Sequence, residues 1–397
     1  MRDDLRATAV LSAAAFFVMM GVSIISPVLP LYALSFGISY ALVGLLIAAF
    51  AIARVVLDIP AGMVASRFGM RRFMLAGLFI IAISSLVAGL APNFETLLAA
   101  RILEGVGSAM YTTTSLTMVS MLAPREARGR HLSLYMSMFL LGSVSGPAVG
   151  GVVAGSFGLA APFLAYGLCG AVSFVMVALW IGEPPAVPGE AKQAITLKQL
   201  GRLLKRYDIV SINLGTFAVF VTRQGIMGTI IPLYAFNNLS MDEVDLGIVL
   251  TLSAVANLST MLLAGRLTDT YGRKPFMLSS LLITGVLITL FPLAEDMVAL
   301  ALILVALGLA LGLTGPIAAW ITDVTEPREL GGAMGLFRTI GDLGFVIAPI
   351  ALAALAGNVG APVSSLPFVI AGLVIIAISL PLIRTSDPIA RQGRGSA

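Results

Sequence analysis

Residues 61–75 read AGMVASRFGMRRFML, and the chain returns to this pattern at residues 264–278, which read AGRLTDTYGRKPFML. The two copies start 203 positions apart. A shorter match lies upstream of each copy, where Pro30-Leu-Tyr-Ala33 returns as Pro232-Leu-Tyr-Ala235. Because the matches keep their order and spacing, they indicate that a unit of about half the chain has been duplicated, with both copies in the same orientation.

Apolar residues dominate the sequence around these copies. Of 397 residues, 58% are hydrophobic and 11% are charged, whereas a soluble domain carries about 25% charged residues. Since a membrane span needs roughly 20 apolar residues, the length allows about a dozen spanning helices. The single cysteine, Cys169, excludes an intramolecular disulfide, and with the single histidine, His131, it leaves no cluster for a metal site. No metal or cofactor is therefore expected.

Twelve apolar runs bounded by glycine, proline, asparagine or charges predict twelve transmembrane helices. The first run is too long for a signal peptide. One long polar stretch divides the runs into six and six. We therefore expect an N-terminal half over 1–182, a cytoplasmic linker over 183–206, a C-terminal half over 207–384 and a cytoplasmic tail over 385–397. The runs are 7–34, 39–65, 71–91, 94–122, 130–157, 160–182, 207–236, 244–267, 275–293, 297–323, 331–356 and 362–383.

Basic residues gather on one side of these predicted helices. Of 24 Lys and Arg, four lie deep inside the runs and the other 20 fall at the termini, in the linker, or in the loops and run ends on the same side. The loops on the other side carry acids but no base, which is the positive-inside pattern. We expect both termini in the cytoplasm, a multi-pass location in the cell inner membrane and a bacterial source. The net charge of +4 belongs to membrane-flanking loops, so no nucleic-acid partner is expected.

Seven charged residues lie deep inside the predicted helices, away from their ends, and the duplication does not repeat most of them. At about 3 kcal/mol per unpaired charge, they would cost about 20 kcal/mol, more than the typical net stability of about 5–15 kcal/mol. They must be paired or hydrated. The seven are Arg54, Asp58, Arg101, Glu104, Arg223, Arg338 and Asp342; the counterparts of Arg101 and Glu104 are Leu304 and Leu307, and those of Arg223, Arg338 and Asp342 are Gly21, Tyr135 and Phe139.

Six of these charges are spaced as pairs on one helix face. Such pairs either neutralise each other during insertion or line a pathway, and polar groups inside spans usually mark pathways. Arg223 has no acid within one turn of its own helix, so it needs a carboxylate from another helix, a wet cavity or an anionic ligand. We expect Arg223 to pair with Asp342. The same-helix pairs are Arg54/Asp58, Arg101/Glu104 and Arg338/Asp342.

A central cavity is expected between the two halves, because parallel repeats place their binding site there. The run Tyr111-Thr-Thr-Thr-Ser115 either satisfies backbone carbonyls or lines this cavity. No convincing nucleophile–base pair indicates an enzyme. We expect the substrate cavity to include Tyr32, Tyr111, Arg223, Gln224, Trp320 and Arg338.

The repeated segment resembles the signature that the major facilitator superfamily carries between helices 2 and 3. The first copy has Ser66 where the family usually has aspartate, whereas Asp269 retains the acid in the second copy. In the family this acid helps to lock the cytoplasmic gate. The resemblance implies gating roles for Gly62, Arg67, Gly69, Arg71, Arg72, Asp269, Gly272 and Arg273.

Two further segments are similar to signatures of proton-coupled members of that family. Arg101-Ile-Leu-Glu104-Gly-Val-Gly resembles the helix 4 motif tied to proton coupling, with Glu104 where glutamine is common. The run from Gly142 to Gly151 matches the helix 5 motif of antiporters, so the whole chain resembles the twelve-helix drug:proton antiporters. Its first helix lacks the acid that several relatives carry there. We expect Gly146, Pro147 and Gly150 to give a close, bent packing of helix 5 against the opposite half and to act in gating.

The resemblance implies an all-α membrane protein with twelve transmembrane helices in two six-helix pseudo-symmetric halves. It also implies a secondary transporter that exports lipophilic small molecules by alternating access, driven by the proton gradient, and we expect a monomer in the lipid bilayer. Glu104 with Arg101 is the expected proton-coupling pair, and Asp58 and Asp342 are the other candidates. A lipid or organic-anion transporter and a non-transporting membrane receptor are the alternatives.

Overall fold

The computed structural model describes residues 2–123, 127–183, 201–326 and 329–387, all without a β-strand. Most of the predicted linker and tail lies outside these residues, as do the side chains of Asp58, Gly62 and Arg67. Eleven described helices are long and apolar enough to cross a membrane. The one predicted span not among these eleven is the fourth in chain order, α5 (Phe94–Leu122), a 29-residue helix that holds Arg101 and Glu104. The prediction of an all-α membrane protein with twelve spans is confirmed.

Six spans precede the linker and six follow it. Several spans are interrupted, and the seventh contains a π-helical segment between two α-helices. The first six spans are formed by α1 (Arg2–Ile25) with α2 (Leu29–Leu34), α3 (Tyr40–Phe68), α4 (Met70–Gly89), α5, α6 (Arg128–Phe157) and α7 (Ala161–Trp180). The last six are formed by α9 (Tyr207–Phe220), η2 (Val221–Ile230) and α10 (Ile231–Leu239); α11 (Glu243–Tyr271); α12 (Lys274–Leu290) with η3 (Phe291–Leu293); α13 (Met297–Gly312) with α14 (Ile317–Val324); α15 (Leu330–Ala354); and α16 (Leu366–Ser379) with η4 (Leu380–Arg384).

Local sequence signals set several helix ends. The side chains of Ser39, Asn93 and Asp296 each accept a hydrogen bond from the backbone N–H three residues later, so they cap α3, α5 and α13. Gly69 and Gly272 end α3 and α11 with φ of 93° and 90°, a backbone conformation that favours glycine. These two glycines stand 203 positions apart in the repeated segment, so the repeat specifies the same turn twice.

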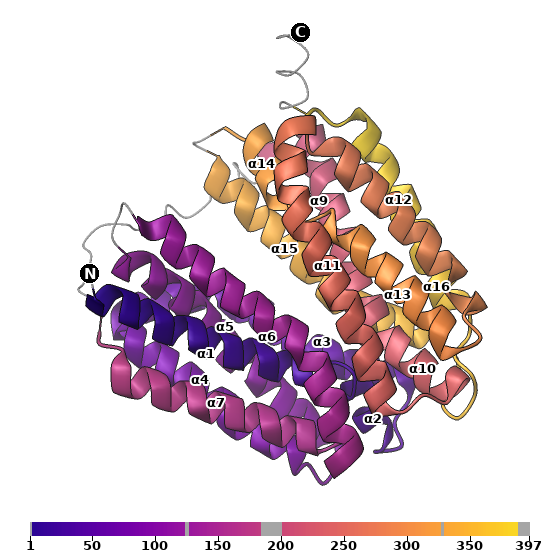
Figure 1. Cartoon of the computed structure of the whole chain (residues 1–397), viewed down its shortest axis with the longest axis horizontal. Helices are drawn as coiled ribbons and strands as arrows, with labels where there is room; N and C mark the ends of the chain where they lie inside the picture. The colour runs from indigo at the N-terminus through magenta and orange to yellow at the C-terminus, as the bar shows by residue number, and fades with distance from the viewer. Residues whose placement is uncertain (1, 124–126, 184–200, 327–328, 388–397) are drawn as a thin grey trace. The chain divides into compact units, whose positions relative to one another are not determined.

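The chain divides into two compact units. Unit 1 comprises Met1–Glu190 with Asp242–Thr251, and unit 2 comprises Ala191–Met241 with Leu252–Ala397. In unit 1, α1 packs along α6 and α7, and α5 packs against α3 and α4 (Figure 1). In unit 2, α12 packs along α16 and α13, while α15 packs along α9 and η2.

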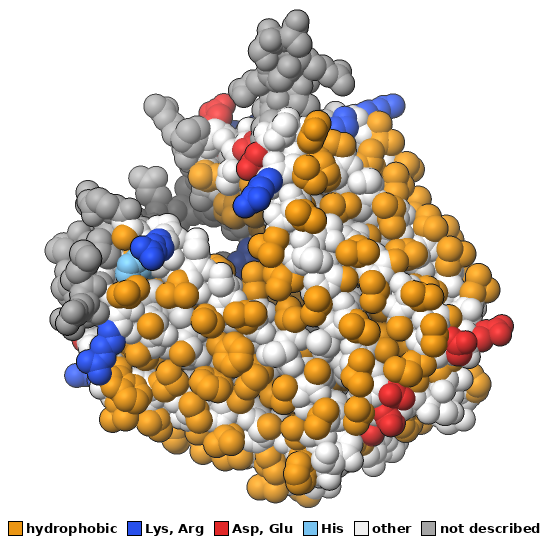
Figure 2. Space-filling model, viewed as in Figure 1, with side chains coloured by type: hydrophobic (Ala, Val, Ile, Leu, Met, Phe, Trp, Pro, Cys, Tyr) orange, Lys and Arg blue, Asp and Glu red, His pale blue; other side chains and the backbone are white. Residues whose placement is uncertain are grey.

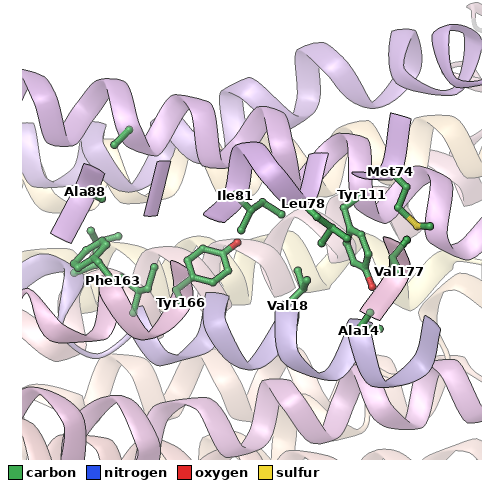
Figure 3. Packing of buried hydrophobic residues seen from close by; sticks show 14 of the residues in the cluster. Ala14, Val18, Met74, Leu78, Ile81, Ala88, Tyr111, Phe163, Tyr166 and Val177 are labelled. Atoms are coloured by element: carbon green, nitrogen blue, oxygen red, sulfur yellow. The ribbon is translucent and has the colours of Figure 1, made fainter. Parts of the chain in front are cut away.

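Large apolar side chains fill the interior of unit 1 (Figure 3). Tyr111, Phe163 and Tyr166 are at most 1% exposed. Tyr32 joins the same cluster: its ring packs 5.0 Å from that of Phe163, and its hydroxyl donates to the carbonyl of Ala88 at 3.1 Å. Because lipid is as apolar as these side chains, close packing rather than water exclusion holds such helices together.

Unit 2 repeats this arrangement at the second Pro-Leu-Tyr-Ala copy. Tyr234 packs edge-on against Phe368 at 5.3 Å, and its hydroxyl donates to the carbonyl of Ala294 at 3.0 Å. Phe368 in turn stacks on Phe291 at 4.8 Å. The repeated tyrosine therefore fastens the same helices in each half, which explains why the duplication retained it.

Apolar side chains also cover the outside of the molecule. Figure 2 shows hydrophobic side chains over most of the visible face, with charged side chains at only a few places. Leu168, Leu262 and Leu302 are 65–67% exposed. A soluble protein rarely exposes so much apolar surface, so this surface is suited to lipid.

Candidate functional site

A buried ion pair lies in the middle of unit 1. Arg101 and Glu104 stand one turn apart on α5, and Nη1 of Arg101 binds Oε2 of Glu104. Glu104 is fully buried and Arg101 is 7% exposed. The second carboxylate oxygen of Glu104 accepts a hydrogen bond from the hydroxyl of Ser85 on α4 at 2.8 Å. The predicted pair therefore exists, with a third member from a neighbouring helix.

Glycines bring the neighbouring helices close to this pair. A Cβ atom at Gly105 would overlap the carbonyl oxygen of Phe50 on α3, so α3 and α5 touch through their backbones. This contact places the ring of Phe50 4.7 Å from the guanidinium carbon of Arg101, a cation–π distance. Arg54 approaches the same ring at 5.9 Å. Two arginines and one acid thus share a small space.

Three buried polar atoms around the pair have no hydrogen-bond partner among the described residues. They are Nε of Arg54, Nε of Arg101 and the hydroxyl of Tyr166. Tyr166, on α7, is within electrostatic reach of Glu104 and both arginines. Native proteins rarely leave such groups unpaired. Opposing influences act on the Glu104 carboxylate: burial opposes its charge, while Arg101 and Ser85 favour it.

The polar run of α5 serves mainly its own backbone. Thr112, Thr114 and Thr117 each donate to the carbonyl four residues earlier, at 2.6–2.8 Å. Ser115 shares a hydrogen bond of 2.7 Å with Tyr135 on α6 and also lies 3.4 Å from the carbonyl of Thr112. The described contacts of the three threonines are those of hydroxyls that satisfy the helix.

A second polar region lies in unit 2, on the π-helical segment η2. The extra residue per turn is visible at Thr229, whose hydroxyl donates to the carbonyl of Gln224, five residues earlier, at 2.8 Å. π-Helical segments are rare, and those that interrupt α-helices occur frequently at functional sites. The side chain of Arg223 is exposed and that of Gln224 is partly exposed. Gly225, by contrast, packs closely on Ala348 of α15.

Arg223 does not pair with Asp342 as predicted. No described residue forms an ion pair or hydrogen bond with the side chain of Arg223, whereas Arg338 and Asp342 on α15 both have partners. The prediction failed because sequence spacing fixes which residues share a face of one helix but not how two helices are rotated against each other. Arg338 is exposed and Asp342 is partly exposed.

Three residues expected in a cavity are packed in the interior instead. Tyr32 and Tyr111 are 7% and 1% exposed, within the core of unit 1. Trp320 is fully buried in unit 2, and its indole N–H donates to the carbonyl of Ser386 at 3.1 Å. Of the six residues expected in the cavity, Arg223, Gln224 and Arg338 have accessible side chains in this structure.

Gly146 and Gly150 of α6 face a helix other than the one we predicted. A Cβ atom at Gly146 or Gly150 would overlap Ser23 or Ile24 of α1, in the same half of the chain. The prediction that these two glycines pack against the opposite half is therefore wrong. For Pro147 the prediction holds: its carbonyl lies against Gly247, at the start of α11 in the predicted C-terminal half, although that segment belongs to unit 1. Small residues show that some helix comes close, but they do not identify it.

The repeated loop carries an ionic cluster in unit 2. Arg273 binds Asp269 at 2.9 Å and Asp323 of α14 at 3.0 Å. It also donates to the hydroxyl of Thr268 at 2.9 Å. Thus Asp269, Gly272 and Arg273, which the sequence grouped by motif alone, belong to one connected turn.

Both units clamp this turn in the same way, a feature that sequence analysis missed. In unit 1 the backbone N–H of Arg71 donates to Glu183 at 3.2 Å, and the guanidinium of Arg71 donates to the carbonyl of Ala178 at 2.7 Å. In unit 2 the N–H of Lys274 donates to Asp387 at 2.9 Å, and its ammonium group donates to the carbonyl of Ile383. An acid at a helix N-terminus is favourable there. The sequence offered one signal for this shared contact: Glu183 and Asp387 stand 204 positions apart, close to the offset of the repeat. Arg72, also expected in gating, is exposed.

Comparisons with known proteins agree with this architecture. The family model described as Major Facilitator Superfamily matches residues 11–211 and 212–396. An MFS-type transporter of Methanocaldococcus jannaschii, MJ1560, is 27% identical over 351 residues, 87% of this chain and 90% of its own. Multidrug resistance protein 2 of Bacillus subtilis is 27% identical over 372 residues, 91% of this chain and 90% of its own. A bacterial homolog of the human lysosomal transporter Spinster has a similar structure, with a TM-score of 0.78 at 16% identity over 96% of this chain and 95% of its own.

Proposed function

The chain belongs to the major facilitator superfamily, and on that premise we propose that it exports lipophilic small molecules in exchange for protons. The observation that carries this proposal is the buried Arg101–Glu104 pair with Ser85. Similarity to a multidrug resistance protein supports the substrate type. The proton gradient supplies the energy, and no cofactor takes part.

The proton acts by breaking the buried pair. While Glu104 is ionised, its two oxygens bind Arg101 and Ser85. When Glu104 takes up a proton, it loses its charge and no longer balances Arg101, which then needs other partners such as water or Tyr166. Because small changes in water access alter this balance, the pair links protonation to helix packing in unit 1. Asp58 and Asp342 are the reserve candidates for the proton.

Transport follows from alternating exposure of a central site to the two sides of the membrane. In this proposal the halves 1–182 and 207–384 move about that site, the linker 183–206 and the tail 385–397 lie in the cytoplasm, and the protein works as a monomer in the inner membrane. The loop residues Gly62, Arg67, Gly69, Arg71 and Arg72, with their unit 2 counterparts and the α6 glycines, control opening on the cytoplasmic side.

The test is flux in proteoliposomes. We would follow pyrenebutyrate, its neutral primary amide and the cationic pyrenebutylamine by fluorescence, with and without a pH gradient. Wild-type flux should rise with the gradient. The variant Glu104→Gln should still bind a probe but lose the response to the gradient, while Glu95→Gln, which changes an exposed acid on the same helix, should behave as the wild type.

One result would contradict the role of Glu104, and another would contradict transport itself. A normal response to the gradient in Glu104→Gln would transfer the coupling role to Asp58 or Asp342. Binding of a probe without flux in the wild type would favour a non-transporting receptor.

A further inference from the structure

Arg223 is a cation without a counter-charge in the membrane-spanning part of unit 2. It lies inside the apolar span Tyr207–Leu239, its side chain is exposed, and no described residue pairs with it. A guanidinium facing hydrocarbon costs about 3 kcal/mol or more. Its side chain therefore requires a wet surface and an anion.

Most acids of unit 2 that could supply this anion are already engaged, and the others lie outside the membrane spans. Asp342 has its own partner. Asp208 binds both the N–H and the hydroxyl of Ser386, at 2.8 and 2.6 Å. Asp269 and Asp323 bind Arg273, Glu329 binds Arg206, Asp387 accepts from the N–H of Lys274, and Asp296 accepts from the N–H of Ala299. The remaining two, Glu295 and Glu326, lie outside the spans. Among the described residues, the neutralising group for Arg223 is missing from the protein itself.

The residues near Arg223 indicate what the rest of the ligand is like. Gln224 and Met227 are also partly exposed on η2, whereas Gly225 faces α15 and leaves no room for a ligand there. Gln224 offers both a hydrogen-bond donor and an acceptor. Met227 offers a flexible, polarisable contact for an apolar body. A cation, an amide and a thioether at membrane depth fit a molecule with one charged end and one apolar end.

The helix itself departs from regular geometry at this point. The π-helical segment Val221–Ile230 includes Arg223 and Gln224, while the equivalent stretch of unit 1, 202 positions earlier, has glycine at the position of Arg223 and is α-helical up to Ile25. An irregular geometry retained beside an unpaired cation is typical of a functional site. Charge and geometry therefore mark the same two residues.

We propose that Arg223 binds the anionic group of the transported molecule, and that this molecule is an amphipathic organic anion. Arg223 forms charge-assisted hydrogen bonds with a carboxylate, sulfonate or phosphate, and Gln224 orients it. The inference rests on the proposed transport function and names its substrate class. The anionic group belongs either to a soluble organic acid or to an anionic lipid, because both carry the same recognised chemistry.

The experiment measures binding, so it does not depend on flux. Full-length protein in neutral detergent is titrated with pyrenebutyrate and with its primary amide, which differ in charge but share the apolar body. The variants are Arg223→Gln and Arg223→Lys, with Arg266→Gln as the control because Arg266 is exposed near the loop end of α11. A parallel series adds lysophosphatidylglycerol as a competitor, with lysophosphatidylcholine as its zwitterionic control.

Wild type should bind pyrenebutyrate more tightly than the amide. Arg223→Gln should weaken pyrenebutyrate binding about 10-fold or more, as expected for a lost charge-assisted hydrogen bond, and leave amide binding within about twofold. Arg223→Lys should restore part of the loss, and Arg266→Gln should bind as the wild type. Competition by lysophosphatidylglycerol that Arg223→Gln abolishes would identify a lipid source, and its absence a soluble acid.

Equal weakening of both probes in Arg223→Gln, or no weakening of either, would overturn the proposal, and thermal unfolding of each variant shows whether it is folded. The two proposals fail separately. Charge-selective binding at Arg223 without any flux would contradict transport but not the anion site. Flux that ignores probe charge in Arg223→Gln and wild type alike would contradict the anion site but not transport.

Discussion

The two halves share a scaffold but differ at the residues placed on it. In unit 1, Gly105 lets α5 touch the carbonyl of Phe50, and in unit 2 Gly308 lets α13 touch that of Ser253. Gly308 and Ser253 each stand 203 positions after their counterparts Gly105 and Phe50, so the repeat has kept this contact. Yet the turn before the glycine carries Arg101 and Glu104 in unit 1, and fully buried Leu304 and Leu307 in unit 2. The ion pair is therefore not needed to build the helix crossing, which supports a functional role for it.

At a second position, unit 2 carries the charge and unit 1 does not. In unit 1, Gly21 lies directly against the ring of Tyr166. Their counterparts in unit 2 are Arg223 and Ala371, so a small and a large side chain have exchanged places. Unit 1 thus holds a compensated charge pair in a closed interior, and unit 2 holds an exposed cation. We interpret this as a division of labour, with proton coupling in unit 1 and substrate recognition in unit 2.

The loop ends of the units differ in a third way. The clamps made by Arg71 with Glu183 and by Lys274 with Asp387 are common to both. The ionic cluster is not. Asp269, Arg273 and Asp323 of unit 2 are replaced in unit 1 by Ser66, Met70 and Ser120.

The strongest way to test the comparison is to give unit 1 the residues of unit 2. Removing one partner, in Arg101→Leu or Glu104→Leu, should destabilise the protein by about 3–5 kcal/mol, because the other charge is left buried and unpaired. The double variant Arg101→Leu/Glu104→Leu should recover most of this stability, since apolar replacement of a buried pair is often neutral. Thermal unfolding in detergent measures these changes.

The double variant should nevertheless lose the response of flux to a pH gradient. If it is folded and still coupled, the pair is scaffold and the proposed division of labour is wrong. If the double variant remains as unstable as the single variants, leucines cannot replace the ion pair in unit 1. The comparison with Leu304 and Leu307 of unit 2 then gives no support for a functional role of the pair.

A smaller effect is expected at the ionic cluster of unit 2. The side chain of Asp323 is 25% exposed and that of Asp269 is 66% exposed, and partly exposed ion pairs contribute about 1 kcal/mol or less. Asp323→Ser, which installs the residue of unit 1, should lower stability by no more than that amount while it slows transport. A loss as large as that of the buried pair would show that the cluster holds unit 2 together rather than controlling its opening.

The fold was accessible from the sequence because lipid imposes simple requirements. The lengths of the apolar runs and the one-sided distribution of Lys and Arg predicted twelve spans, and the structure has them. The Arg101–Glu104 pair was also accessible, because three residues along a helix is a fixed geometry. Ser85 was not, because its contact depends on how α4 is rotated against α5.

The errors have the same physical origin. Gly146 and Gly150 predicted a close helix contact, but no local rule identifies α1 as the partner. The proposed pairing of Arg223 with Asp342 needed the rotation of two separate helices. The π-helical segment at Arg223 results from packing of the whole unit, and no residue pattern predicts it. The repeated Pro-Leu-Tyr-Ala motif was predicted to supply a cavity residue in Tyr32, and its role in this structure is packing.

The most direct test of the division of labour is proton release on ligand binding. Pyrenebutyrate is added to the protein in weakly buffered detergent, and the change in pH is recorded together with the bound fraction. The account predicts proton release from the wild type, binding without release from Glu104→Gln, and neither binding nor release from Arg223→Gln at the same probe concentration. Undiminished release from Glu104→Gln, or undiminished binding by Arg223→Gln, would contradict it.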